Sequence, residues 1–163
     1  MKKILAAILM ILCIPCAVGC NEKYGIIPFE NKDVIAECCV NGRFDVIITK
    51  EGEATTIEVA SPEEIGGLTF HFSKGESYVI SGDVKIPITK STYKGIYAIA
   101  FIFNIREDMA LSATSQDGNG TVDFSCQMGE YSFIYDSKGY LYKVHIKSPD
   151  YEYEIDIKGM KIQ

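Results

Sequence analysis

Hydrophobic and polar residues alternate with a period of two along most of the chain after residue 32, in short runs that end at glycine, proline or asparagine. This pattern is typical of half-buried antiparallel strands joined by tight turns. We expect six strands before the middle of the chain, over residues 33–40, 44–50, 55–60, 68–72, 78–80 and 84–89. Four more are expected near the end, over residues 121–127, 130–136, 140–147 and 151–158.

The strand pattern also predicts which faces are buried. Tyr78 should continue the inward face of Phe70, and Tyr142 should lie on the inward face of its strand. The opposite face of the last two strands is expected to be solvated and to carry cross-strand charge pairs. Those pairs would join Lys143, His145 and Lys147 to Glu152, Glu154 and Asp156. Pro87 cannot donate to a ladder, so the sixth strand should be an edge strand.

One long apolar segment, residues 92–108, breaks the strand pattern. Ile96, Ile99 and Phe103 recur at helical spacing, and Tyr97 and Phe101 add apolar surface on the other sides. A buried strand over residues 96–105 is the rival interpretation, but the length of the segment favours a helix. Such a helix needs cover on more than one face. We expect a curved sheet to wrap one side, while the other side packs or borders a cavity.

The N-terminus carries a secretion signal. Lys2 and Lys3 precede an apolar run over residues 4–18, which is shorter than the roughly 20 residues needed to cross a bilayer. The run ends in Ala-Val-Gly-Cys, which resembles the lipobox at which bacterial lipoproteins are diacylglycerated and cut. Residues 1–19 would then be removed and Cys20 would carry the lipid. The alternative is an ordinary signal peptide that leaves a soluble secreted protein.

The remaining chain suits one domain. Residues 20–32 would form a tether from Cys20, and residues 33–163 a single domain with its own core. Removal of the signal leaves 14 basic and 22 acidic residues, a formal charge of −8. Such an acidic surface argues against nucleic acid and against electrostatic docking on anionic lipid. Contact with the membrane is therefore expected through the diacylglyceryl group on Cys20.

Three cysteines remain beyond Cys20. Cys38 and Cys126 alternate with apolar residues and should face the core, whereas Cys39 points to the other face. Buried free thiols and a Cys38–Cys126 disulfide both fit this pattern. A metal site made from the three cysteines lacks the usual ligand spacing.

The sequence gives no positive sign of catalysis. His71 and His145 alternate with inward apolar residues, so both are expected on the polar face. Motifs of serine hydrolases, zinc proteases and phosphate-binding loops are absent from the sequence. Residues 117–120, Asp-Gly-Asn-Gly, suit a hairpin turn better than a calcium loop. We therefore expect neither an enzyme nor a cofactor.

A resemblance to a known family comes from residues 61–70, Ser-Pro-Glu-Glu-Ile-Gly-Gly-Leu-Thr-Phe, and the hairpin at Gly75 that follows. The segment resembles small lipoproteins of Gram-positive anaerobes whose fold is similar to the LolA, LolB and RseB lipoprotein carriers. The resemblance extends as a pattern over most of residues 26–158. It implies an unclosed, strongly curved antiparallel barrel with helices on its concave side. The space between them would accommodate acyl chains or another apolar ligand.

These observations predict an α+β, mainly β domain: a curved antiparallel half-barrel wrapped around one central helix. The expected function is a membrane-anchored extracytoplasmic lipoprotein that binds a lipid-like or other hydrophobic ligand between sheet and helix. Residues expected to contact that ligand are Tyr97, Phe101, Ile105, Phe70, Tyr78 and Tyr142. The alternative is a cell-surface module with a fully packed interior that meets a protein of the cell envelope at its convex face or an exposed edge.

Overall fold

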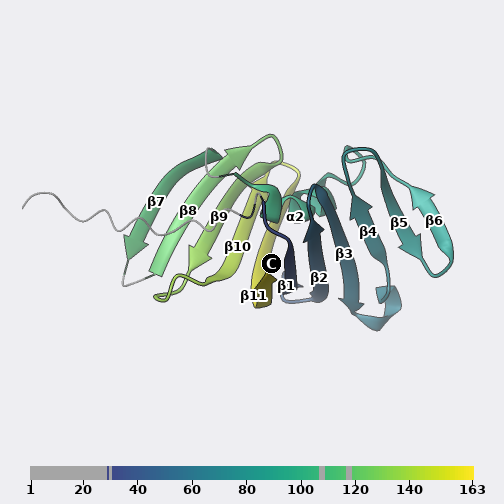
Figure 1. Cartoon of the computed structure of the whole chain (residues 1–163), viewed down its shortest axis with the longest axis horizontal. Helices are drawn as coiled ribbons and strands as arrows, with labels where there is room; N and C mark the ends of the chain where they lie inside the picture. The colour runs from purple at the N-terminus through teal and green to yellow at the C-terminus, as the bar shows by residue number, and fades with distance from the viewer. Residues whose placement is uncertain (1–28, 30, 107–108, 117–118) are drawn as a thin grey trace, which may run out of the picture.

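Over the residues that the structure describes, the protein is one long antiparallel sheet, not closed into a barrel, with one short α-helix against it (Figure 1). The structure is a computed structural model that describes residues 29, 31–106, 109–116 and 119–163. Eleven strands follow the order β6-β5-β4-β3-β2-β1-β11-β10-β9-β8-β7. The first six are β1 (Val34–Val40), β2 (Phe44–Glu51), β3 (Ala54–Ser61), β4 (Thr69–Phe72), β5 (Ser77–Ser81) and β6 (Val84–Pro87). The last five are β7 (Ala110–Gln116), β8 (Asn119–Cys126), β9 (Gly129–Tyr135), β10 (Leu141–Ser148) and β11 (Tyr151–Ile162).

Two meanders meet at the centre of the sheet, where β1 pairs with β11. Local turn chemistry builds each meander. Asn41 and Gly42 both have positive φ, 53° and 62°, which matches the type I′ hairpin that an Asn-Gly pair predicts. The edge position of β6, which contains Pro87, is confirmed.

The helix is shorter than the sequence predicts. An α-helix, α2 (Lys94–Ala100), passes into the 3-10 turn η3 (Ile102–Asn104), and the backbone is extended at Ile105. Branched and aromatic residues lose rotamer freedom in a helix, and the Asn104 amide bonds back to the Ala100 carbonyl oxygen at 3.3 Å. Both effects favour an early end. Within the residues that the structure describes, no helix is long and apolar enough to span a membrane.

Strand β7 was not predicted, so the expected count of ten strands is wrong by one. The side chains of residues 110–114 are exposed on both faces of the sheet. A strand without a buried face has no alternation of apolar and polar residues for a sequence pattern to detect. The order is therefore six strands, a helix and five strands.

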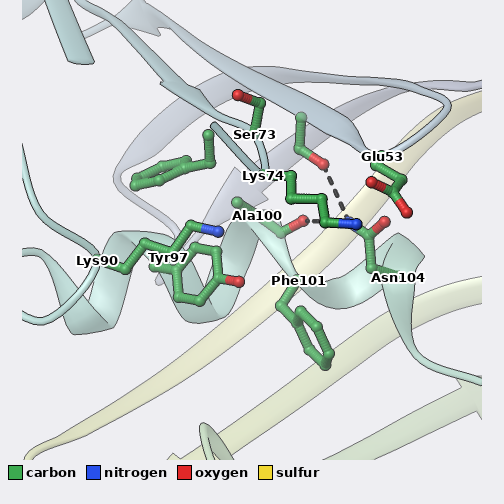
Figure 2. Close-up of a pocket in the computed structure, with 10 residues that line it drawn as sticks. Glu53, Ser73, Lys74, Lys90, Tyr97, Ala100, Phe101 and Asn104 are labelled. Carbon is green, nitrogen blue, oxygen red and sulfur yellow. Dashed lines mark hydrogen bonds between the residues drawn. The ribbon is translucent and has the colours of Figure 1, made fainter. Parts of the chain in front are cut away.

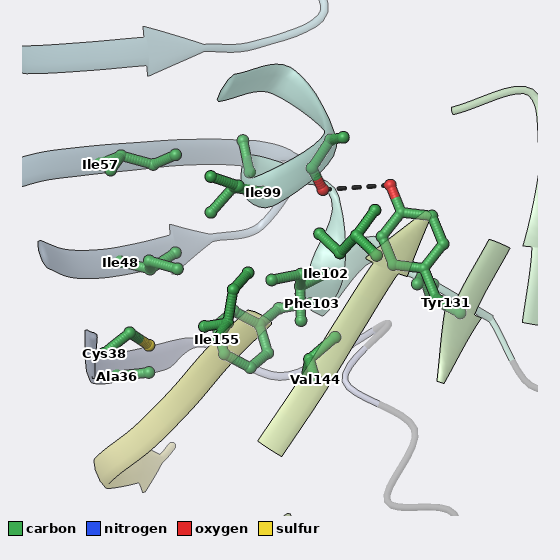
Figure 3. Close-up of a cluster of buried hydrophobic side chains, with 14 of the residues drawn as sticks. Ala36, Cys38, Ile48, Ile57, Ile99, Ile102, Phe103, Tyr131, Val144 and Ile155 are labelled. Carbon is green, nitrogen blue, oxygen red and sulfur yellow. Dashed lines mark hydrogen bonds between the residues drawn. The ribbon is translucent and has the colours of Figure 1, made fainter. Parts of the chain in front are cut away.

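The core lies between the sheet and the helical segment (Figure 3). Ile102 and Phe103 are fully buried in one cluster with Val144 and Ile155 of β10 and β11. Tyr131 of β9 donates a buried hydrogen bond from its hydroxyl to the Ala98 carbonyl oxygen at 3.1 Å. This bond fixes the height of α2 above one half of the sheet.

The N-terminal segment is fastened to the same core. Phe29 is only 2% exposed and packs edge to face on Phe103, with ring centres 5.2 Å apart. Lys50 of β2 is 1% exposed, and its ammonium donates to the carbonyl oxygens of Phe29 at 2.9 Å and Lys32 at 2.7 Å. The core thus reaches into residues 20–32, the range that the sequence suggests as a tether.

Candidate functional site

An apolar pocket of about 230 Å³ lies between α2 and strands β2 to β4. Alternate residues of these strands point to the helix, and their registers align Ile48, Ile57 and Phe70 in one row across the sheet. From the helix, Ile96 and Ile99 face this row. The apolar pocket is lined by Val40, Phe44, Val46, Ile57, Val59, Ile65, Leu68, Phe70, Ile96, Ile99 and Tyr153.

The one hydroxyl-bearing side chain in this lining is turned against the helix. A Cβ atom placed on Gly95 would lie 2.3 Å from the Tyr153 hydroxyl oxygen, so a larger residue in this turn of α2 would force the Tyr153 side chain to move. The glycine costs roughly 1 kcal/mol of helix stability relative to alanine, and it allows the close approach. Burial, together with neighbouring Tyr151, raises the pKa of Tyr153. The apolar pocket therefore offers a ligand dispersion and hydrophobic contact rather than charge.

A second, polar pocket of about 250 Å³ lies on the other side of α2 (Figure 2). Its wall contains Thr55, which is buried and accepts a hydrogen bond from the Asn104 amide nitrogen at 3.0 Å. The polar pocket is lined by Glu53, Thr55, Phe72, Ser73, Lys74, Lys90, Tyr97, Ala100, Phe101 and Asn104. The two pockets thus use different residues of one helix and neighbouring positions of β3 and β4.

The predicted ligand residues separate into groups. Phe70 lines the apolar pocket. Tyr97 and Phe101 line the polar pocket instead. Ile105 belongs to the core and borders neither pocket. Cys20 lies outside the described residues.

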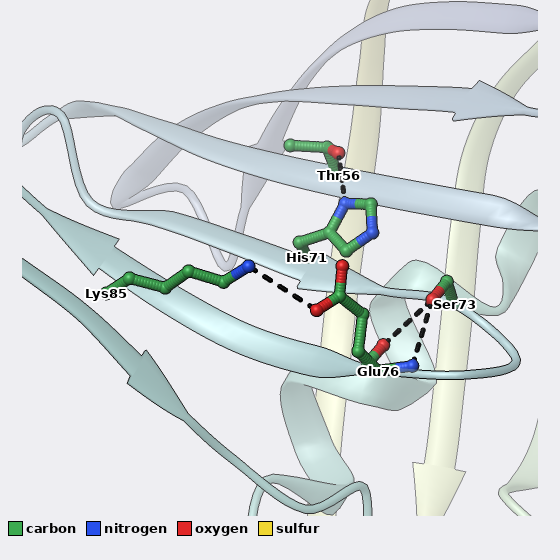
Figure 4. Close-up of polar contacts among 5 residues, drawn as sticks. All are labelled: Thr56, His71, Ser73, Glu76 and Lys85. Carbon is green, nitrogen blue, oxygen red and sulfur yellow. Dashed lines mark hydrogen bonds and ion pairs between the residues drawn. The ribbon is translucent and has the colours of Figure 1, made fainter.

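Tyr78 does not face the helix, because Val79 pairs with Phe70 and continues its inward face. The predicted face of β5 is therefore wrong by one residue. On the convex face, Tyr78 stacks on His71 with ring centres 4.7 Å apart, and the Lys85 ammonium lies 3.5 Å from its ring centre. Figure 4 shows His71 and Lys85 in this group, with the Thr56 hydroxyl 3.2 Å from His71 Nδ1 and Glu76 paired to Lys85 at 3.4 Å.

Tyr142 also departs from the predicted face. The ladder between β9 and β10 shifts register between Leu141 and Lys143, so Leu141 turns inward and Tyr142 is 40% exposed. A bulge of this kind inserts one residue and reverses the alternation before it. Beyond the bulge, the predicted faces of β10 and β11 are confirmed.

The predicted charge ladder is present on the convex face of β10 and β11. Lys143 pairs with Glu154 at 2.6 Å and with Asp156 at 3.3 Å, and His145 lies 3.1 Å from Glu152. The hydrogen bond from Lys143 holds the pKa of Glu154 below its usual range. These ion pairs are exposed and contribute little stability, so they mark the solvated face of the sheet and do not form a binding site.

The cysteines Cys38, Cys39 and Cys126 are free thiols. Cys38 faces the core as predicted, and burial raises its pKa to about 12. Cys126 is half-buried, and its sulfur accepts a hydrogen bond from the Met128 amide at 3.4 Å. Among the described residues, no group of three histidine, cysteine or acidic side chains is placed to hold a metal ion.

Sequence reasoning placed Val46 and Val59 on the inward face but did not identify them as pocket residues. Alternation along a strand tells which side chains face the helix. Whether these side chains contact the helix depends on the distance between helix and sheet, and large residues on other strands determine that distance. Ile65 and Leu68 follow Pro62. They were the pocket residues that the sequence marked most clearly, because the paired glycines between them interrupt the strand pattern.

Comparisons with known proteins give only distant structural likenesses. No protein-family model and no curated protein matches the chain. An uncharacterized conserved protein from Thermus thermophilus matches with 7% identity and a TM-score of 0.45, over 80% of this chain and 78% of that chain. A LolA superfamily protein from Nitrosomonas europaea matches with 11% identity and a TM-score of 0.39, over 81% of this chain and 85% of the other.

A third similar structure is described as an outer membrane lipoprotein-sorting protein domain, from Vibrio parahaemolyticus. It matches with 10% identity and a TM-score of 0.39, over 80% of this chain and 85% of that chain. At TM-scores below 0.5, these likenesses leave both the family and the function of this chain open.

Proposed function

We propose that this chain is a lipid-anchored protein of the extracytoplasmic face of a bacterial membrane, which binds a hydrophobic, lipid-like ligand in the apolar pocket. The observation that carries this proposal is the pocket of about 230 Å³ between α2 and strands β2 to β4. A binding role is proposed rather than a catalytic one.

The lining of the apolar pocket determines the kind of ligand. Apart from Tyr153, whose hydroxyl lies against Gly95, the lining side chains are aliphatic or phenylalanine. A ligand that brought a charge into this space would leave that charge without a partner, at a cost of several kcal/mol. The occupant is therefore an uncharged hydrocarbon group.

The size of the apolar pocket limits the length of this group. An enclosed cavity of about 150 Å³ holds a benzene molecule, and sites for drug-sized ligands begin near 300 Å³. With a volume of about 230 Å³, the pocket suits a short alkyl chain or one end of a longer one.

The proposed anchor is consistent with the position of the core. Phe29, which is buried, follows Cys20 by nine residues. Nine residues span at most about 30 Å when fully extended. A diacylglyceryl group on Cys20 would therefore keep the domain, and the pocket within it, close to the membrane surface.

Two experiments test the proposal. Mass spectrometry of organic extracts from protein purified gently from its host membrane should find a stoichiometric hydrophobic compound. Empty extracts, together with no change in thermal stability after delipidation, would contradict the ligand. Labelling with radioactive palmitate should mark the wild-type chain and not Cys20→Ala, and equal incorporation in both would refute the anchor.

A protein-interaction module is the second candidate, and strand β7 favours it. Residues 110–114 of this terminal strand are exposed on both faces, and β7 contains neither proline nor a charged residue. Edge strands of this kind accept an added strand from a partner. Crosslinking on intact cells that captures one protein at β7, while lipid extracts are empty, would favour this second function.

A further inference from the structure

The polar pocket beside α2 is not used by the proposed lipid-binding function. It has a volume of about 250 Å³, and its lining combines aromatic rings with charged and amide side chains (Figure 2). These two kinds of lining imply a ligand different from the one in the apolar pocket.

The apolar part of the polar pocket is aromatic. Tyr97 lies between Phe72 and Phe101, with ring centres 5.3 Å and 6.2 Å away. Phe72 is buried, and the other two rings are half-buried. A flat ligand can stack on such a surface or meet it edge to face, and it gains dispersion contacts without a long alkyl chain.

Two lysines supply the charge. Lys90 precedes α2, and its ammonium lies 4.8 Å from the centre of the Tyr97 ring, a cation–π contact that keeps it at the pocket. Lys74 comes from the turn between β4 and β5. Over the part of the chain that the structure describes, neither lysine forms an ion pair, whereas Lys85 and Lys94 pair with Glu76 and Asp150.

Glu53 is the carboxylate that lines the same pocket, and it pairs with neither Lys74 nor Lys90 among the described contacts. The lining therefore carries one more positive than negative charge, in a protein whose formal charge is −6. A local excess of positive charge against an acidic background concentrates anions at this place on the surface.

The amide side of the polar pocket is held rigid. Asn104 donates to the Thr55 hydroxyl at 3.0 Å and to the Ala100 carbonyl oxygen at 3.3 Å, so both its amide protons are engaged and its orientation is fixed. The wall next to the two lysines is thus preorganised, which lowers the cost of ordering it around a ligand.

We propose that the polar pocket binds a small organic anion in which one carboxylate is attached to an aromatic ring. Lys74 and Lys90 pair with the carboxylate, and the rings of Phe72, Tyr97 and Phe101 contact the ligand ring. The volume of about 250 Å³ exceeds the roughly 150 Å³ cavity that holds benzene, which leaves room for the carboxylate. Because the lysines are partly solvated, the affinity is modest and falls as salt is added.

Calorimetric titration with phenylacetate and with phenylacetamide, an uncharged molecule of the same shape, tests the proposal. Phenylacetate should bind at least about fivefold more tightly than the amide at low salt, the factor expected from about 1 kcal/mol of ion pairing. Lys74→Gln and Lys90→Gln should each reduce this difference, and the double variant should remove most of it. Lys138→Gln, an exposed lysine in a remote turn, is the matched control and should change nothing.

Equal binding of acid and amide, or phenylacetate binding that both glutamine variants leave unchanged, would overturn the proposal. Val59→Phe, which fills the apolar pocket, separates this proposal from the lipid-binding function. It should leave phenylacetate binding intact, and loss of binding in this variant would show that the anion uses the apolar pocket instead. Thermal unfolding of each variant verifies that the fold is retained.

Discussion

The two flanks of helix α2 face the same sheet and differ in how completely they are filled. On the flank toward β8 to β10, Tyr131, Phe133 and Ile146 are each at most 1% exposed, and the Tyr131 hydroxyl reaches the Ala98 carbonyl oxygen. On the flank toward β2 to β4, Val46 and Val59 border a pocket of about 230 Å³.

This difference indicates how the pocket arises. The hydrogen bond from Tyr131 to the Ala98 carbonyl oxygen holds the helix above the half of the sheet that contains β9, at a height that suits a long side chain. Short branched side chains at the corresponding depth on the other half cannot close the gap, because interiors are close-packed only where side-chain volumes match the space. Both halves of the sheet alternate inward and outward side chains in the same way. The apolar pocket therefore results from the smaller size of the inward side chains on β2 and β3.

The largest expected effect comes from emptying the filled flank. Phe133→Ala should cost about 4 kcal/mol of unfolding free energy, since its ring is enclosed and lies 5.0 Å from that of Phe124. Phe70→Ala, the matched change on the open flank, should cost at least about 1 kcal/mol less, because part of that ring already borders empty space. Urea denaturation measures both. Equal losses would contradict the distinction between the flanks.

The next effect concerns the fastening of the N-terminal segment. Lys50→Met should cost about 2 kcal/mol, because the carbonyl oxygens of Phe29 and Lys32 lose a charged, buried donor. Lys158→Met, on the exposed face beside Asp45, is the control and should change stability little. Urea denaturation compares the two variants. A Lys50 variant as stable as its control would show that the segment is held by Phe29 alone.

A third effect is absent at neutral pH and grows as the pH rises above 9. Burial raises the pKa of Cys38 from its ordinary value of 9.0 to about 12. Below pH 9 the thiol is protonated in both states and its contribution is complete. Between pH 9 and 12 the unfolded chain releases the proton while the folded chain keeps it, so stability falls by about 1.4 kcal/mol per pH unit.

Urea denaturation from pH 8 to 11 checks this effect. Cys38→Ala should lose stability less steeply than the wild type above pH 9, whatever its loss at neutral pH. Cys126→Ala, a change of the same chemistry at a half-buried site, should keep the wild-type slope. Parallel curves for wild type and Cys38→Ala would refute the coupling between thiol burial and stability.

The sequence predicts those parts of the fold that depend on local periodicity. The Asn41-Gly42 hairpin, the edge strand with Pro87 and the charge ladder around Lys143 depend on a few neighbouring residues, and all three are confirmed. Strand β7 was not predicted because it has no buried face. The register shift after Leu141 turns Tyr142 outward, and the alternation of apolar and polar residues does not reveal such a shift.

The candidate site is less predictable because it depends on distances between distant residues. Phe70 was predicted to be a ligand contact, since an inward aromatic residue near the helix is visible from alternation, and it lines the apolar pocket. Tyr97 and Phe101 were predicted to add apolar surface to the helix, but the sequence does not show that they line the polar pocket. The open volume depends on the helix height, which Tyr131 determines from β9.

The most direct test of the central claim measures ligand entry into the apolar pocket. The chain has no tryptophan, so Leu68→Trp places the only indole at the pocket. Titration of this variant with decanol should give a saturable change in indole fluorescence. Adding Val59→Phe, which fills the pocket, should abolish the response, whereas Val84→Phe, the same change on exposed β6, should retain it. The same saturable response in the filled variant, or none in any variant, would contradict the account.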